Sequence, residues 1–187
     1  METSTNKGLQ LGDKCPNFDL PCVDGSVRGL RSYDPIKVLV VAFTCNHCPY
    51  VQAYEDRIMA IQREMASAGA QVVCINANET ANFPEDSFEK MIERARSRWF
   101  NFHYLRDESQ ASAKAFGAEC TPEFFVFDDK RVLRYRGRLD DNKDNPKAVT
   151  QTYLRDAITA LLRGDAPATP STSAIGCSIK WDSAKAH

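Results

Sequence analysis

The sequence predicts an α/β protein built on a central mixed β-sheet with helices on both faces. Apolar, β-branched segments alternate along the chain with segments whose apolar residues recur at three- and four-residue steps, which is the helical period. The predicted order is β-α-β-α followed by β-β-α. The two strands around the first helix must therefore be parallel with a right-handed crossover, while the later strands form a hairpin.

The N-terminal part is expected to be an arm followed by a small hairpin. Residues 1–14 are interpreted as a mobile or loosely packed arm. Between Cys15 and Tyr33 the chain is short and rich in turn residues, and Asp24-Gly25 separates two short extended segments. This arrangement is typical of a β-hairpin.

The first core strand and helix follow. Val38–Phe43 is apolar throughout, as expected for a parallel strand that is buried on both faces. The period then changes, which predicts an amphipathic helix that ends before Gly69. Its inward residues would be Val51, Tyr54, Ile58, Ile61 and Met65. A second strand is predicted over Gln71–Asn76.

The middle of the chain predicts a second helix and a short strand–helix unit. Asp86 is interpreted as the N-cap of the second helix, because Glu89 provides an acid three residues later. The apolar face of this helix would be Phe88, Met91, Ile92, Ala95 and Trp99. A strand around His103–Arg106 and a helix over Ser109–Phe116, which Gly117 stops, are predicted next.

The C-terminal part predicts a hairpin, a helix and a tail. Glu123–Phe127 and Val132–Tyr135 are interpreted as strands, and Pro146 as the start of a helix that Arg163-Gly164 closes. Residues 165–174, dense in Pro, Ala, Ser and Thr, predict a flexible linker. The expected organisation is an arm (1–14), one domain (15–164), and a linker with a short tail (165–187).

Composition excludes several classes of function. The 187 residues carry 24 Lys and Arg against 25 Asp and Glu, so the net charge of −1 argues against nucleic acid or an anionic membrane as the main partner. The longest apolar run, Val38–Phe43, is far shorter than the roughly 20 residues of a membrane helix. The N-terminus has no apolar segment typical of a secretory signal. We therefore expect a cytoplasmic protein without membrane or nucleic-acid partners.

Cysteine is the unusual residue in this composition. The odd number of seven, in a chain with no export signal, argues against a disulfide-stapled scaffold. Cys74 is expected in the core, and Cys15 and Cys22 are expected to be structural. Only Cys45 and Cys48 have an informative spacing, Cys-x-x-Cys.

The predicted strand and helix place this pair in a reactive setting. Cys45 would lie at the carboxyl end of the first core strand and Cys48 in the first turn of the next helix. The N–H groups and partial positive charge of a helix N-terminus favour a thiolate, and a protonated His47 would add to the effect. We expect Cys45, nearer the helix tip and more exposed, to attack, and Cys48 to resolve.

The chain resembles the thioredoxin-fold redoxin superfamily, and most of all its peroxiredoxin-like group, often labelled alkyl hydroperoxide reductase / thiol-specific antioxidant. The matching stretches are Gly12-x-x-x-Pro16-x-Phe18-x-Leu20-x-x-x-Asp24-Gly25, Phe43-Thr44-Cys45-Asn46-His47-Cys48-Pro49-Tyr50-Val51, and the Gly-Cys-Ser-Ile-Lys-Trp tail at Gly176–Trp181. The resemblance implies a thioredoxin-like fold over residues 15–164. It also implies that Thr121 and a cis Pro122 lie beside the pair and shape a groove for a partner's extended chain.

The sequence also departs from related patterns. Thr44 stands where thioredoxin usually has Trp, which favours a dedicated exchange role over general thioredoxin duty. A peroxidatic site of true peroxiredoxins reads Pro-x-x-x-Thr/Ser-x-x-Cys, and counting back from either Cys45 or Cys48 does not reproduce it. The hydroxyl group that should orient a peroxide is therefore missing.

The favoured prediction is a thiol–disulfide oxidoreductase of redox homeostasis that needs no metal or organic cofactor. Its substrate would be a disulfide-containing protein or a small thiol or peroxide, and its reductant a dithiol protein such as thioredoxin. One alternative is a thiol peroxidase, in which Cys45 becomes a sulfenic acid and Cys48 or Cys177 condenses with it. The other is a thioredoxin-fold binding module without turnover.

Two further cysteines leave alternatives open. Cys177, on a mobile tail, could reach Cys45 in its own chain or in the partner of a homodimer, as a second resolving thiol, or could simply follow Ile179 and Trp181 as they dock. Cys120 is either a third redox thiol or a small packed residue. In the metal-binding alternative, Cys120 with His47 or Cys177 would complete a zinc site around the pair.

Overall fold

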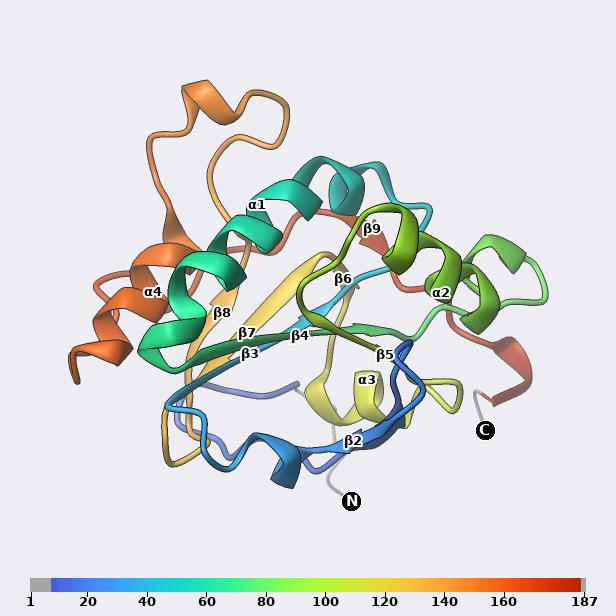
Figure 1. Ribbon diagram of the computed structural model, residues 1–187, viewed down its shortest axis with the longest axis horizontal. Helices are drawn as coiled ribbons and strands as arrows, with labels where there is room; N and C mark the ends of the chain where they lie inside the picture. Colours follow the sequence, from blue (N-terminus) through green and yellow to red (C-terminus); the bar gives the residue numbers. More distant parts are fainter. Residues whose placement is uncertain (1–7, 186–187) are drawn as a thin grey trace, which may run out of the picture.

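A five-stranded mixed sheet forms the centre of the protein, whose computed structural model describes residues 8–185 (Figure 1). The strand order is β5-β4-β3-β7-β8. The strands span β3 (Val38–Phe43), β4 (Ala70–Asn76), β5 (His103–Arg106), β7 (Glu123–Phe127) and β8 (Leu133–Gly137). Strands β3, β4 and β5 are parallel, whereas β7 and β8 run antiparallel to their neighbours, so the predicted mixed sheet is confirmed.

Helices cover both faces of this sheet, as predicted. The helices are α1 (Pro49–Met65), α2 (Phe88–Ser97), α3 (Ala111–Phe116) and α4 (Tyr153–Leu162). Helices α1, α2 and α4 pack on one face, while α3 and the N-terminal hairpin pack on the other (Figure 1). Within the described residues, no helix has the length and apolar character needed to cross a membrane.

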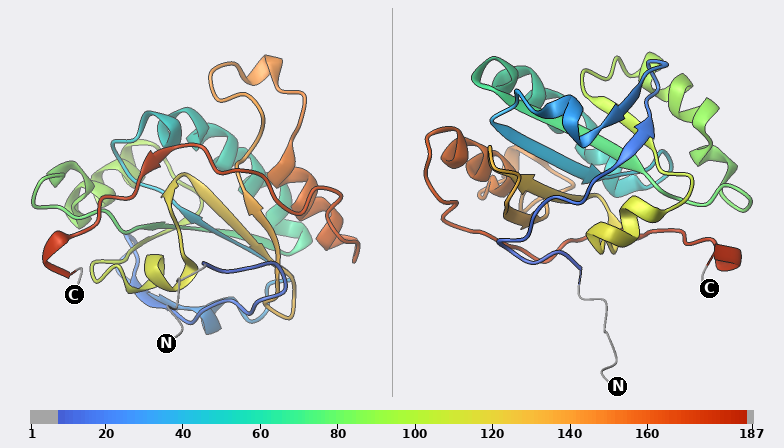
Figure 2. Two further views of the ribbon diagram at one scale, coloured as in Figure 1. Left: turned by 180° about the vertical axis from the view of Figure 1, so that it is seen from behind. Right: turned by 90° about the horizontal axis from the view of Figure 1, so that it is seen from below.

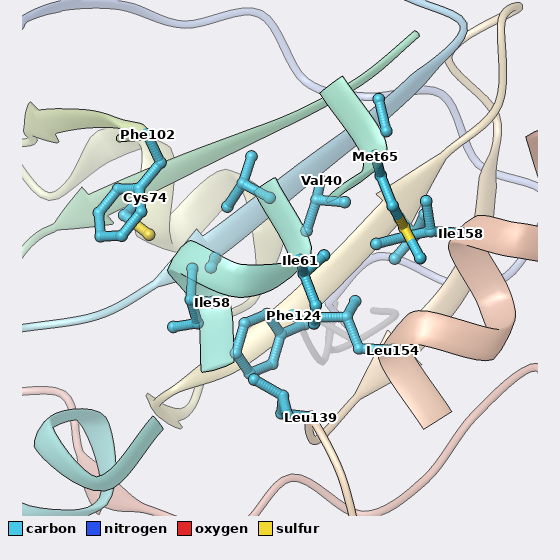
Figure 3. Packing of buried hydrophobic residues seen from close by; sticks show 14 of the residues in the cluster. Val40, Ile58, Ile61, Met65, Cys74, Phe102, Phe124, Leu139, Leu154 and Ile158 are labelled. Atoms are coloured by element: carbon cyan, nitrogen blue, oxygen red, sulfur yellow. The ribbon is translucent and has the colours of Figure 1, made fainter. Parts of the chain in front are cut away.

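Strand β3 divides its side chains between the two cores. Val38, Val40 and Ala42 point to the α1 side, and the residues between them point to the other side, as the period of a strand requires. Figure 3 shows Ile61 of α1 and Leu154 and Ile158 of α4 gathered over Val40 and Phe124. The apolar pattern along the chain is thus converted into one core on each face of the sheet.

Short elements complete the fold. The hairpin consists of β1 (Asp19–Pro21) and β2 (Val27–Gly29), joined through Asp24-Gly25 as predicted. Two further strands, β6 (Cys120–Thr121) and β9 (Cys177–Ser178), pair with each other away from the central sheet. Single 3-10 turns lie at Leu30–Tyr33, Ala66–Ala68, Pro84–Asp86, Pro146–Ala148 and Ser183–Lys185.

Two helix boundaries differ from the prediction. The last helix begins at Tyr153, because Pro146 starts only a 3-10 turn in which the Asn145 side chain accepts a hydrogen bond from the N–H of Lys147. Helix α2 ends at Ser97, so Trp99 does not lie on its inward face. Trp99 has a φ of 55° and its side chain is 85% exposed.

The predicted arm and linker are held against the domain where the structure describes them. Residues 1–7 of the arm lie outside the described residues, but Leu9 donates to the Phe116 carbonyl and Gly12 to the Leu133 carbonyl. In the linker, Thr172 exchanges backbone and side-chain hydrogen bonds with residues 136–138 at the edge of β8. The expectation of a loose arm and a free linker is wrong for these parts, because each finds unpaired backbone groups on the domain.

Truncating a core side chain of α4 tests this packing. Leu154→Ala removes a fully buried side chain, and we expect the free energy of unfolding to fall by about 2–5 kcal/mol. The neighbouring Arg155→Ala removes only an exposed pair with Glu64 and should cost about 0–1 kcal/mol. Denaturant titration of both variants measures the difference, and equal effects would contradict the described packing.

Candidate active site

The Cys-x-x-Cys segment connects β3 to α1, as the sequence predicts. The N–H of Thr44 still donates to Ile75 of β4, so the sheet continues to the residue before Cys45. Cys48 is the N-cap of α1 with an extended backbone, and Pro49 occupies the first helical position. Pro is well suited to that position because its missing N–H would have no partner there.

Neither sulfur is exposed, which differs from the expectation for Cys45. The side chains of Cys45 and Cys48 are 1% and 0% exposed. Thr121 lies against both of them: its Oγ1 is 3.5 Å from Cys45 Sγ and its backbone oxygen 3.2 Å from Cys48 Sγ. The reason for the burial is tertiary, because Thr121 and Cys177 cover Cys48, while Cys45 lies among Val51, Cys74 and Tyr104.

The peptide bond between Thr121 and Pro122 is cis, as the resemblance implied. It directly follows β6, so Thr121 and Pro122 stand beside the sulfur pair. Adjacent strand residues point to opposite sides, and Cys120 therefore faces away, into an open pocket that Glu119, Glu123 and Arg136 also line. Burial raises the pKa of Cys120 to about 12, so this thiol is not activated.

Cys177 joins the pair from the far end of the chain. Strand β9 is antiparallel to β6 with Cys177 opposite Thr121, and Cys177 Sγ lies 2.7 Å from Cys48 Sγ. The structure thus brings three sulfurs together. One of the two alternatives for Cys177 was that it reaches Cys45, but the sulfur in contact is that of Cys48. Burial raises the pKa of Cys177 to about 11.

The electrostatic surroundings favour a thiolate on Cys48 rather than on Cys45. A hydrogen bond from the Cys45 thiol lowers the pKa of Cys48 most, and the Cys177 thiol and the N–H of Val51 lower it further. Conversely, the pKa of Cys45 is raised by its hydrogen bond to Cys48, by burial and by the nearby Asp86 carboxylate. These contacts therefore distinguish the two thiols, and they favour the charged form at Cys48.

Asp86 is a site residue that sequence reasoning misassigned. Its carboxylate is fully buried and accepts from Asn46 N at 2.6 Å, His47 Nδ1 at 2.5 Å and Asn78 Nδ2 at 2.8 Å. The cap of α2 is instead Ser87, whose hydroxyl accepts from the N–H of Lys90. The turn at Pro84–Asp86 directs the Asp86 side chain toward the Cys-x-x-Cys segment.

A signal for this cluster was present in the sequence. Asn76 is the last residue of β4 and Asn78 follows the strand, and the carboxyl ends of parallel strands meet at one edge of the sheet. There Tyr104 donates to Asn46 Oδ1 at 2.9 Å, and the His47 ring stacks on Phe83 with 5.2 Å between centroids. The segment between the two cysteines is therefore held from both sides.

Among residues 8–185, one group of side chains could hold a metal ion. The ligand atoms of Cys45, His47 and Asp86 lie within 4.8 Å of one another. The Asp86 oxygens, however, already accept hydrogen bonds from Asn46, His47, Asn76 and Asn78, which a metal would have to displace. Cys120 and Cys177, which the metal hypothesis used to complete a zinc site, are not members of this group.

Comparison with known proteins gives a consistent result. The model of the family described as Redoxin matches residues 10–153. A hypothetical protein from Sinorhizobium meliloti 1021 is 37% identical over 95% of this chain and 97% of its own, with a TM-score of 0.89. An uncharacterized conserved protein from Geobacillus kaustophilus is 38% identical over 95% of this chain and 95% of its own, also with a TM-score of 0.89.

A more distant structure shares only the fold. Peroxidoxin BcpB from Mycobacterium tuberculosis is 20% identical, with 83% of this chain and 97% of that chain covered and a TM-score of 0.62. No curated protein matches this chain. The comparisons thus agree with the thioredoxin-like fold that the sequence predicted.

Replacing Asp86 tests its influence on Cys45. Because the Asp86 charge raises the pKa of Cys45, Asp86→Asn should lower the pH midpoint of Cys45 alkylation by on the order of one unit. Both proteins carry Cys48→Ser, which removes the stronger effect of the hydrogen bond to Cys48. Peptide mass mapping measures the alkylation of Cys45.

The matched control is Glu85→Gln. The Glu85 carboxylate is 3.9 Å from the His47 ring but half exposed, so water screens it and the midpoint should move by less than about 0.3 unit. An equal shift in both variants would mean that Asp86 has no special effect on Cys45.

Proposed function

The chain belongs to the Redoxin family, and from this we propose that it is a thiol–disulfide oxidoreductase that works through Cys45, Cys48 and Cys177. The observation that carries the proposal is the contact of Cys48 with two other thiols beside the cis Thr121–Pro122 bond. We propose that it acts in a reducing compartment such as the cytoplasm, and that another dithiol protein supplies its electrons.

The proposed reaction starts at Cys48. Its thiolate attacks one sulfur of a substrate disulfide, which forms a mixed disulfide and releases the other substrate sulfur as a thiolate. A neighbouring thiol of the site then gives its proton to that thiolate and attacks Cys48 Sγ, which releases the second substrate sulfur. The final product is the Cys45–Cys48 disulfide, formed directly or through Cys48–Cys177. Two electrons pass from the dithiol to the substrate, and a dithiol reductant reverses the steps.

The neighbours of the pair have separate roles in this scheme. The Cys45 thiol stabilises the Cys48 thiolate in the resting state by donating a hydrogen bond to it. Asp86 and His47 hold the intervening Asn46-His47 segment, and the Asp86 charge keeps Cys45 protonated until the mixed disulfide has formed. Thr121 contacts both sulfurs and holds β6 against them.

Cysteine variants test which sulfur attacks. Cys48→Ser should slow the reduction of a small disulfide by at least about 100-fold, since it removes the nucleophile. Cys45→Ser combined with Cys177→Ser removes both thiols that can resolve, so a mixed disulfide should accumulate on Cys48. Peptide mass mapping identifies the cysteine that forms the mixed disulfide. A mixed disulfide on Cys45 in the Cys48→Ser variant would mean that Cys45 attacks first.

Two controls accompany these variants. Cys120→Ser removes a partly exposed thiol that faces away from the pair, and its rate should stay within about twofold of the parent protein. Hydrogen peroxide is run as a second oxidant. Consumption of peroxide no faster than by an ordinary thiol argues against the peroxidase alternative, whereas rapid formation of a sulfenic acid would favour it.

The pH dependence gives an independent prediction. Because the pKa of Cys48 is lowered in the folded state, its alkylation rate should change little between about pH 8 and 6, whereas an ordinary thiol of pKa about 8.5 would slow by roughly two orders of magnitude. The residue-specific rate is read by mass mapping. An ordinary thiol profile at Cys48 would contradict the assignment of the resting thiolate to this residue.

A further inference from the structure

The C-terminal strand β9 occupies the backbone edge beside the redox pair. An unpaired strand edge is a template on which an extended polypeptide can add a strand, and β6 offers such an edge next to both sulfurs. In this protein the edge is already used: Cys177 and Ser178 pair with Thr121 and Cys120. The protein's own chain thus fills the place of an extended partner.

We propose that the docked tail, residues 176–180, excludes extended polypeptide disulfides and restricts the site to small disulfides, with Cys177 in the place of a partner's sulfur. This inference rests on the proposed function, since it assigns a substrate class to the same cysteine pair.

The fit of the tail to β6 is close at Gly176. A Cβ atom added to Gly176 would lie 2.0 Å from the backbone oxygen of Thr121, which is far inside contact distance. Only glycine therefore lets the tail approach the residue that precedes the cis-proline. This approach places the next residue, Cys177, with its sulfur 2.7 Å from that of Cys48.

Several further contacts anchor the tail. The side chain of Ile179 is buried in the core on the α3 side, and its N–H donates to the Glu119 carbonyl. The N–H of Lys180 donates to Asn78 Oδ1, while its carbonyl accepts from the N–H of Glu79 and from Gln110 Nε2. Figure 2 (left) shows the tail, in red, running across the molecule past β6. The tail is therefore an ordered part of the site.

The exchange steps need only the three cysteines of this chain and the small disulfide. A small disulfide reacts at Cys48 to give a mixed disulfide and one small thiolate; Cys177 loses its proton and attacks Cys48 Sγ, which forms Cys48–Cys177 and releases the second small thiol. Cys45 then gives its proton to a released small thiolate and attacks Cys48 Sγ, which forms Cys45–Cys48 and frees Cys177 as a thiolate. A small disulfide needs only a shift of the Cys177 side chain, whereas a polypeptide that pairs with β6 requires the loss of β9.

The test displaces the tail without removing any cysteine. Gly176→Val should displace the tail from Thr121, and Ser173→Val, which places the same side chain at an exposed residue before the tail, is the control. Each protein is assayed with oxidised glutathione and with a linear peptide disulfide. We expect the ratio of the peptide rate to the glutathione rate to rise at least about tenfold in Gly176→Val and to stay unchanged in Ser173→Val.

A second variant guards against misfolding at Gly176. Gln110→Asn shortens the side chain that binds Lys180 and Asp182, and Asn tolerates the φ of 63° at this position. Like Gly176→Val, this variant should react faster with the peptide disulfide than the parent protein does. Faster hydrogen exchange at residues 177–180 reports the release of the tail in either variant.

The outcomes separate the two proposals. If the parent protein reacts with oxidised glutathione no faster than a free thiol, the proposed function fails. If that reaction is fast but the ratio of peptide to glutathione rates is unchanged in variants whose tail is released, the proposed function stands and the exclusion by the tail is wrong.

Discussion

The position of strand β3 at the centre of the sheet fixes the position of the rest of the structure. It is hydrogen-bonded to β4 on one edge and to β7 on the other, and its side chains are buried on both faces. Because the strand cannot move in any of these directions, its carboxyl end is fixed, and so is the start of α1. The Cys-x-x-Cys segment therefore occupies a rigid corner between the sheet and a helix, where small differences in hydrogen bonding decide which sulfur is charged.

The polar surroundings make the two cysteines unequal. The buried carboxylate of Asp86 lies on the Cys45 side, while the first turn of α1 and two thiols surround Cys48. A negative charge is disfavoured near the first and favoured near the second, so the pair is polarised before any substrate arrives. This asymmetry agrees with the proposed reaction, in which Cys48 attacks the substrate. Cys45 first donates a hydrogen bond to Cys48 and later loses that proton.

The tail connects two parts of the chain that are far apart in sequence. It crosses the domain, pairs with β6 and brings Cys177 to Cys48, so the same segment contributes backbone contacts and a sulfur. The close approach of Gly176 to Thr121 and the burial of Ile179 act together, because both would be lost if the tail were displaced. Access to the dithiol is thus linked to a competition at one strand edge.

The sheet, the helices and the position of the Cys-x-x-Cys pair could be predicted from the sequence, because apolar periodicity and the two-residue spacing are local properties of the chain. Even there, Pro146 and Trp99 were misread, since a 3-10 turn and a positive φ override local propensity. The environment of Cys48, the orientation of Asp86 toward the site and the contact of Cys177 with Cys48 arise only from tertiary packing. These facts depend on burial and on contacts between residues up to 129 positions apart, which no local pattern encodes.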